Sequence, residues 1–319
     1  MFKKLLVTFL VVVFLGSAYL GSSYRSWKNN TLQRLHAESS VVETAVGDVE
    51  YRLWGDQGPV MLWLHGTRGS YAQYTPNKRS NIPPMRVLAV SRPGYLRTPL
   101  DTGKTPEQQA TAYAALLDVL NIDSVIVMGV SGGGPSALSF ASEYPNRTMA
   151  LILAEAVSQP IDYEDSGASA SILTSLMDTD FFSWLLNSMF LSNPESIVTM
   201  LVPDPNNQRK LLEDPYKIKR LKQTIETTAL PSIFLSGVSN DGLQTKNLNL
   251  NFEAINSPTL IIHGTADSAV PIDQSKKLSQ QLRNAEFVQI EAADHFMMHS
   301  HMEEVDAAIV SFLQTNGVE

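Results

Sequence analysis

The feature that most constrains the fold is a regular alternation of short apolar runs, rich in β-branched residues, with amphipathic stretches of helical period. Several of these runs are almost wholly apolar, which is typical of parallel strands covered by helices on both faces. Strands that alternate with helices predict an α/β fold built on a parallel sheet. The eight predicted strands are 41–46, 49–54, 60–64, 86–90, 124–130, 149–155, 259–263 and 286–291.

The segment from about 158 to 257 breaks this alternation. It contains helical patterns such as ASILTSLMDTDFFSWLLNSMF and DPYKIKRLKQTIETTAL, punctuated by prolines and without a convincing strand. A helical insertion between two strands of one sheet favours a cap, although the same helices could simply extend the core. We expect a core formed by 41–157 and 258–319, with 158–257 as a helical cap insertion.

The N-terminus has the composition of a targeting segment. Lys3 and Lys4 precede an apolar stretch that only Thr8 interrupts, and the small residues Gly16-Ser17-Ala18 follow it. This order predicts a secretory signal peptide or a retained N-terminal membrane anchor over 1–24, and a buried structural helix is the weaker alternative. A polar tether over 25–40 would follow. Because the two lysines should stay in the cytoplasm, we expect an extracytoplasmic globular part, either secreted or membrane-anchored.

Charge and cysteine content exclude several classes of function. The formal net charge of −8 and the lack of a basic patch argue against nucleic-acid binding. The chain has no cysteine, which rules out disulfides, thiolate metal sites and a cysteine nucleophile. Nothing in the sequence predicts a cofactor or a metal, and the oligomeric state stays open.

The stretch VMGVSGGGPSALSFA, from Val127 to Ala141, places four glycines around Ser131 between a predicted strand and a predicted helix. Gly129 to Gly133 fit the pattern G-x-S-x-G, whose strained turn exposes a nucleophilic serine at the end of a strand. A tight structural turn is the alternative. The exposed serine is favoured because the other residues that such a nucleophile requires are also present.

A serine hydroxyl needs a neighbouring base, and that base needs an acid. Of six histidines, His295 is the candidate base, because it lies in a loop directly after the last predicted strand. Asp267, in the loop after the preceding strand, is the candidate acid. Glu155, at the end of another strand, is its main rival, while Asp241 and Asp294 are weaker alternatives.

An oxyanion formed during acyl transfer needs preorganised donors. We expect the backbone N–H groups of Gly132, in the turn, and Thr67, in the loop after VMLWLHG, to provide them. Arg68 follows Thr67 and either biases the entrance toward anionic substrates or is simply solvated. No substrate-binding residues are predicted.

Five segments together resemble the α/β-hydrolase superfamily: HGTRGS, SRPGYLRTPL, GVSGGGPSA, HGTADSAVP and DHF. The resemblance extends from about Val41 to the C-terminus. It implies a doubly wound, mostly parallel sheet, a cap after the sixth strand, and a catalytic triad of Ser131, His295 and Asp267. Arg68 departs from the pattern, since many relatives carry proline there, and the cap matches no recognisable subgroup.

The resemblance implies a serine esterase that hydrolyses carboxylic esters of small or medium size through an acyl-enzyme. Ser131 argues against the dehalogenases and epoxide hydrolases of the superfamily, which carry aspartate at that position. A C–C bond hydrolase and an aminopeptidase remain alternatives with the same triad. A non-catalytic, membrane-tethered binding module is a third, disfavoured because every catalytic position holds a competent residue.

Overall fold

The computed structural model describes residues 2–161, 176 and 178–318. The chain divides into two compact units, Met1–Ser39 and Ser40–Glu319. The first unit consists mainly of one helix, α1 (Phe2–Ala37), so the polar stretch expected as a tether continues the helix rather than interrupting it.

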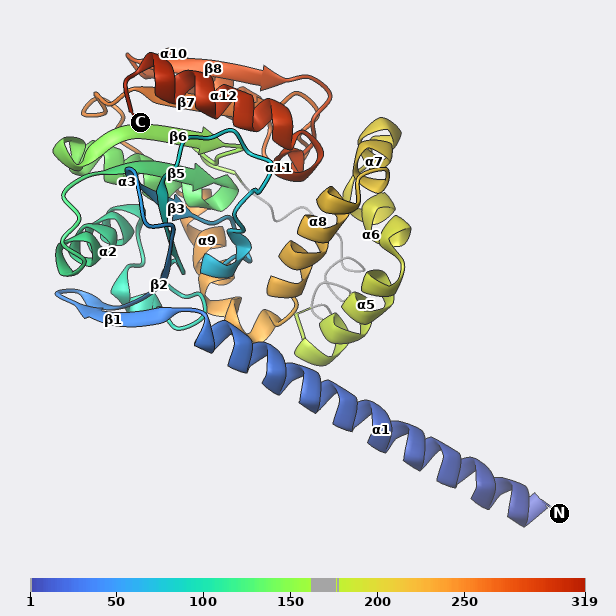
Figure 1. The fold of residues 1–319 in the computed structure, drawn as a ribbon. Coiled ribbons are helices and arrows are strands. Elements are labelled where there is room, and N and C mark those ends of the chain that lie inside the picture. Colours follow the sequence, from blue (N-terminus) through green and yellow to red (C-terminus); the bar gives the residue numbers. More distant parts are fainter. Residues whose placement is uncertain (1, 162–175, 177, 319) are drawn as a thin grey trace. The chain divides into compact units, whose positions relative to one another are not determined.

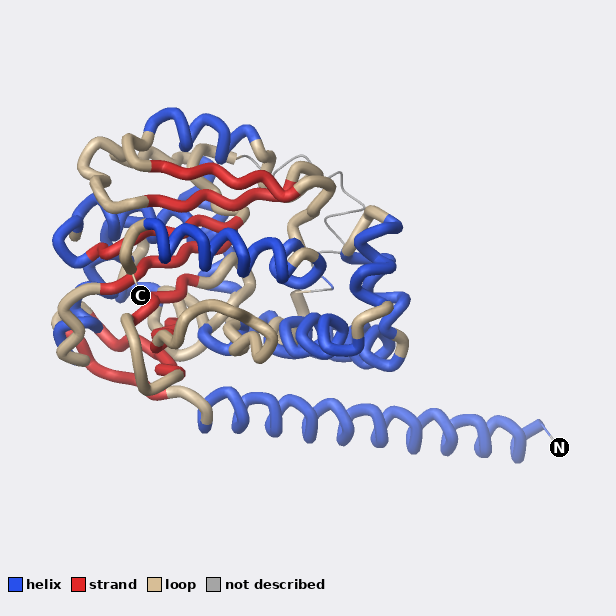
Figure 2. Tube along the Cα trace, turned by 45° about the horizontal axis from the view of Figure 1, so that its top comes forward, coloured by secondary structure: helices blue, strands red, loops and turns tan. Residues whose placement is uncertain are grey.

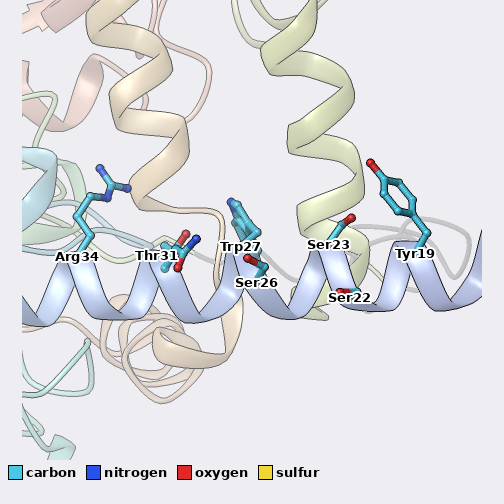
Figure 3. Close-up of a pocket in the computed structure, with 8 residues that line it drawn as sticks. Tyr19, Ser22, Ser23, Ser26, Trp27, Thr31 and Arg34 are labelled. Carbon is cyan, nitrogen blue, oxygen red and sulfur yellow. The ribbon is translucent and has the colours of Figure 1, made fainter.

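Helix α1 changes character along its length. It contains the apolar run and is, among the described residues, the one helix long and apolar enough to cross a membrane. Figure 3 shows how polar and aromatic side chains then occupy one face of the same helix at helical spacing, namely Tyr19, Ser22, Ser23, Ser26, Trp27, Thr31 and Arg34. A signal peptide and a membrane anchor both fit the apolar part.

The second unit contains an eight-stranded sheet in the order β1-β2-β4-β3-β5-β6-β7-β8 (Figure 1). The pairs β1–β2 and β2–β4 are antiparallel, and all other pairs are parallel. The mostly parallel, doubly wound sheet expected from the sequence is confirmed, with every strand within two residues of its predicted bounds. The strands are β1 (Ser40–Thr44), β2 (Gly47–Trp54), β3 (Val60–Leu64), β4 (Arg86–Val90), β5 (Val125–Val130), β6 (Thr148–Ala154), β7 (Thr259–Gly264) and β8 (Ala285–Ile290).

Helices cover both faces of this sheet. Alternate residues of β3 belong to different apolar clusters: Leu62 lies in the cluster that contains side chains of α2, α3 and α10, and Trp63 lies in the cluster that contains side chains of α12. This period of two is expected for a strand buried on both faces. The helices are α2 (Pro106–Val119), α3 (Gly134–Glu143), α10 (Asp273–Gln281), α11 (Met297–Ser300) and α12 (Met302–Thr315). As the sequence predicts, α2 begins with Thr105 as N-cap and Pro106 as its first residue.

Between β6 and β7 the described residues form helices, in agreement with the expected helical insertion. Figures 1 and 2 show α5 to α8 gathered apart from the sheet, on the side toward which β6, β7 and β8 point. Three of these helices begin at a proline, the position where its missing N–H costs nothing. The helices are α5 (Asp180–Ser192), α6 (Pro194–Leu201), α7 (Pro205–Leu212), α8 (Pro215–Thr227) and α9 (Leu235–Lys246).

The inserted helices have a small apolar cluster of their own, formed by Val198, Val202, Leu211 and Leu221. Among the large apolar side chains of the insertion, Trp184 is buried, whereas Phe181 and Met189 are exposed. Met177 lies outside the described residues, as does the side chain of Phe190. No pocket for a substrate follows from these side chains.

Candidate active site

Ser131 stands at the end of β5, where the chain turns directly into α3. Its φ of 49° lies in the left-handed region, which is uncommon for residues other than glycine. The turn packs tightly against the helix, since a Cβ on Gly129 would lie 2.6 Å from Cβ of Ala137. The local geometry is therefore the strained strand–turn–helix arrangement that the G-x-S-x-G pattern predicts.

A relay of hydrogen bonds connects Ser131 to two residues from distant loops. The Nε2 atom of His295 lies 3.0 Å from Oγ of Ser131, and its Nδ1 lies 2.7 Å from Oδ2 of Asp267. The Asp267 side chain is buried, while a quarter of the His295 side chain is exposed. With Nδ1–H donating to Asp267, Nε2 is free to accept the proton of the serine hydroxyl.

The surroundings of Asp267 keep it ionised. Its Oδ1 accepts the backbone N–H groups of Ala269 and Val270, and its Oδ2 lies 3.3 Å from Nε2 of His263. Burial alone would raise the pKa of Asp267, but the hydrogen bonds from His263 and His295 hold it well below its ordinary value. Asp267 can therefore fix the orientation of the His295 ring and stabilise its charged form.

The same contacts raise the pKa of His295, whereas they lower that of Asp267. Burial disfavours a charged imidazolium, but the hydrogen bond to Asp267 and the nearby Glu155 carboxyl outweigh it and raise the pKa of His295 above its ordinary value. A base of raised pKa accepts a proton more readily, although it requires a higher pH to start unprotonated.

The two expected oxyanion donors lie together beside Ser131. A Cβ placed on Gly66 would come within 3.1 Å of Cβ of Ser131, and one on Gly132 would lie 3.0 Å from the backbone nitrogen of Thr67. The loop after β3 thus approaches the turn after β5 closely. The structure brings the predicted residues together, and their role in binding an oxyanion stays a prediction.

The sequence did not reveal what holds this loop. Asp241, in α9, binds the buried guanidinium of Arg92 through both carboxylate oxygens, and its Oδ2 also accepts hydrogen bonds from the hydroxyls of Tyr95 (2.6 Å) and Thr67 (2.8 Å). Arg92 lies in the segment SRPGYLRTPL, but the sequence analysis assigns it no role, and nothing in the sequence pairs it with an acid so far along the chain. Asp241 therefore lies on the side of Ser131 where the oxyanion donors are expected, here called the oxyanion side, and not beside His295.

Arg68 and His65 also belong to this loop. The Arg68 side chain lies 2.7 Å from Oδ1 of Asp178 and is partly exposed, so it is ion-paired rather than simply solvated. His65 has a structural role, because its Nε2 accepts the backbone N–H of Arg92 and its Nδ1 lies 2.7 Å from the carbonyl oxygen of Gly66. Burial lowers the pKa of His65, which keeps it neutral.

Glu155, the rival acid, lies close to the relay without forming a hydrogen bond to it. Its Oε2 is 3.6 Å from Nδ1 of His295. Among the described residues, Glu155, Asp267 and His295 are near enough to one another to bind a metal ion. However, Nδ1 of His295 and both oxygens of Asp267 already take part in hydrogen bonds, which is typical of an acid–base relay.

Comparison with known proteins places this chain in a family. The model of the α/β hydrolase fold matches residues 59–301, and the chain therefore belongs to the α/β-hydrolase family. A solved α/β-hydrolase fold protein from Nakamurella multipartita superposes with a TM-score of 0.78 at 29% sequence identity, covering 88% of this chain and 99% of that one.

Two bacterial relatives are similar over most of their length. The chain is 25% identical to the uncharacterized hydrolase YcgS of Bacillus subtilis, over 84% of this chain and 96% of that protein. It is 26% identical to a 2-hydroxy-6-oxononadienedioate/2-hydroxy-6-oxononatrienedioate hydrolase of Cupriavidus pinatubonensis, over 86% of this chain and 95% of that protein. The family and these relatives support a hydrolase that acts on small molecules.

Proposed function

We propose that this protein is a serine hydrolase of carboxylic esters, with Ser131 as nucleophile, His295 as general base and Asp267 as its acid partner. The observation that carries the proposal is the relay from Oγ of Ser131 through His295 to the buried Asp267. The left-handed conformation of Ser131 supports it, since strain of this kind is concentrated at functional sites.

The reaction follows from this geometry. Oγ of Ser131 attacks the ester carbonyl carbon while Nε2 of His295 removes the hydroxyl proton, and the backbone N–H groups of Thr67 and Gly132 stabilise the oxyanion. His295 then donates the proton to the leaving alcohol as its C–O bond breaks, which leaves an acyl-enzyme. Water, deprotonated by His295, attacks the acyl carbon, releases the acid and restores Ser131.

The experiment that tests the proposal combines covalent labelling with a serine variant. A fluorophosphonate should label the purified protein, and the modified peptide should contain Ser131. Ser131→Ala should remain folded, lose labelling and lower kcat for p-nitrophenyl acetate by at least ~10³. Turnover close to that of the wild-type protein, after contaminating esterases are excluded, would contradict the assignment.

Hydrolysis of a C–C bond is the second candidate, supported by the name of the relative from Cupriavidus pinatubonensis. That name describes a doubly charged dioate substrate, which requires cationic partners. Here Arg68 and Arg92, which follow β3 and β4, are ion-paired with Asp178 and Asp241, so a dioate would have to compete with these carboxylates to bind either arginine. Comparing kcat/KM for neutral p-nitrophenyl esters and for a dienedioate decides between ester hydrolysis and C–C bond hydrolysis. If the protein turns over neither substrate, a peptidase or a binding module is left.

The proposed substrate size rests on the helical insertion. If 158–257 closes over the site as a cap, it would limit the space for the acyl chain, and each methylene that can be buried there adds about 0.8 kcal/mol of binding until that space is full. Across acetate, butyrate, octanoate and palmitate esters, kcat/KM should therefore rise and then fall. A maximum at palmitate would show that the pocket is open to long chains.

The proposed location rests on α1. We expect residues 1–24 to serve as signal peptide or membrane anchor and the hydrolase to lie outside the cytoplasm, because Lys3 and Lys4 precede the apolar run. Protease added to intact spheroplasts should digest the domain. Release that requires detergent identifies an anchor, a mature N-terminus near Tyr19 identifies cleavage, and a soluble, fully protected protein would refute the expected location.

A further inference from the structure

Two carboxyl groups, from different strands, face the same nitrogen of His295. Asp267 follows β7 and forms the short contact, with its Oδ2 at 2.7 Å from Nδ1. Glu155 directly follows β6, and its Oε2 lies 3.6 Å from the same atom. One acid is sufficient to orient an imidazole and stabilise its charge. The second carboxyl therefore needs its own explanation.

Glu155 is unusual in its backbone as well as its side chain. Its φ is 51°, a left-handed conformation that costs free energy in a residue with a side chain. Only 2% of the residue is exposed, and its buried Oε1 has no hydrogen-bond partner among the residues that the structure describes. The carboxyl does have a hydrogen bond with the backbone of Met297, but a buried carboxyl oxygen without a partner is destabilising, so this one structural contact does not account for Glu155.

The charges around Glu155 show what state it adopts. Burial raises its pKa to about 8, His295 opposes the shift, and the negative charges of Asp267 and Asp294 reinforce it. At neutral pH Glu155 therefore retains its proton while Asp267 is ionised. If Asp267 were removed, one of the two nearby negative charges would be lost and ionisation of Glu155 would become easier.

We propose that Glu155 is a positioning residue, a second acid partner for His295 that takes over the Nδ1 hydrogen bond when Asp267 is absent. The proposal rests on the proposed function of Ser131 and His295. The required movement is small, because a contact of 3.6 Å needs to shorten by less than about 1 Å to reach ordinary hydrogen-bond length. Removal of the Asp267 carboxylate opens the space into which Glu155 would move.

Two replacements of Asp267 separate this proposal from a single-acid site. In Asp267→Asn, the amide oxygen can keep the contacts to Ala269 and Val270 while the amide N–H₂ occupies Nδ1 as a donor and forces the wrong tautomer. In Asp267→Ala, Nδ1–H is left for Glu155. Asp267→Ala should therefore be more active than Asp267→Asn, although the alanine disturbs the loop more.

The kinetic experiment compares four proteins with the same p-nitrophenyl ester. We expect Asp267→Asn to lower kcat by about 10⁴ and Asp267→Ala to retain at least about tenfold more activity than it. Adding Glu155→Gln to Asp267→Ala should remove this excess, whereas Glu155→Gln alone should lose far less than any Asp267 variant. Equal activities of Asp267→Ala with and without Glu155→Gln would overturn the proposal.

A spectroscopic measurement tests the hydrogen bond without substrate. At a pH where His295 is charged, a proton shared between Nδ1 and a carboxylate gives a strongly downfield NMR signal, which should persist in Asp267→Ala and vanish when Glu155→Gln is added. If folded Asp267→Ala lacks this downfield signal, the proposal is overturned. If Asp267→Ala does not fold, Asp267→Ser serves instead, because its hydroxyl can still accept the N–H of Ala269.

These outcomes are distinguishable from failure of the proposed function. A wild-type protein that hydrolysed no ester and was not labelled at Ser131 would contradict the proposed function, yet the NMR signal would still report which carboxyl binds His295. An active wild-type protein whose signal is lost in Asp267→Ala would contradict only the second acid partner.

Discussion

The two sides of Ser131 differ in how completely their charged groups are paired. On the oxyanion side, both oxygens of Asp241 bind Arg92, and the hydroxyls of Tyr95 and Thr67 complete its contacts. On the acid side, His295 meets two carboxyls, and one oxygen of Glu155 has no partner among the described residues. The first side holds one carboxylate that is fully paired, although Nε of Arg92 has no hydrogen-bond partner among the described residues, whereas the second side holds two carboxyls for one imidazole.

This difference matches what each side is proposed to do. Oxyanion donors act best when they are fixed before the reaction, because reorganisation would reduce their benefit. A general base must gain and lose a proton in every cycle, so its surroundings have to stabilise two charge states. We therefore expect the Thr67 loop to be rigid and the protonation around His295 to be adjustable within the same site. Variants on the two sides should then lose activity or stability in different ways.

The largest effect should come from breaking the buried pair of Arg92 and Asp241. Asp241→Leu leaves the Arg92 guanidinium buried and unpaired, which costs about 3–5 kcal/mol of folding free energy. Urea unfolding followed by circular dichroism measures the loss. The matched control is the double variant Arg92→Met/Asp241→Leu, which should recover most of the stability because no buried charge remains. A single variant as stable as the wild-type protein would show that Asp241 is dispensable.

Most of the fold could be predicted because each element is specified locally. Buried strands such as Val60–Leu64 are short apolar runs, and α2 carries its own cap and proline. The N-terminal helix was harder to delimit, since nothing in the polar residues 25–37 marks an end to it. Its extension to Ala37 follows from continued helix-forming residues without glycine or proline.

The candidate site was predictable where motif and strand end coincide. Ser131, Asp267 and His295 each follow a recognisable strand, and the ends of parallel strands meet at one edge of the sheet. The pairing of Arg92 with Asp241 could not be predicted, because it joins the turn after β4 to the inserted helix α9. The distance between Glu155 and His295 depends on a backbone conformation that the sequence does not specify.

A smaller effect should follow from loosening the oxyanion loop without removing a charge. Thr67→Val keeps the shape of the side chain but removes the hydrogen bond to Asp241, so the loop that carries the Thr67 N–H becomes less fixed. We expect kcat to fall about tenfold with KM nearly unchanged, because a preorganised donor acts mainly in the transition state.

Thr67→Ser is the matched control, since its hydroxyl can still donate to Asp241 and should keep kcat close to the wild-type value. Steady-state kinetics of the two variants with one ester provide the test, and thermal melts show whether both remain folded. A valine variant as active as the serine variant would mean that the hydrogen bond does not support the loop.

The smallest effect should appear on the acid side, as a change in pH dependence rather than in maximal rate. His295 acts as a base only when unprotonated, so kcat/KM should rise with pH, with a midpoint above the ordinary histidine pKa of about 6.5. The negative charge that Glu155 acquires near pH 8 favours the imidazolium. Glu155→Gln cannot carry that charge, so kcat/KM of this variant should rise at lower pH than in the wild-type protein.

Profiles of kcat/KM between pH 5 and pH 10 measure the shift. Asp294→Asn is a second variant for the same measurement, because it removes a negative charge that acts on both Glu155 and His295. A rise displaced to higher pH in Glu155→Gln would mean that Glu155 lowers the pKa of His295 and that its charge has the opposite role.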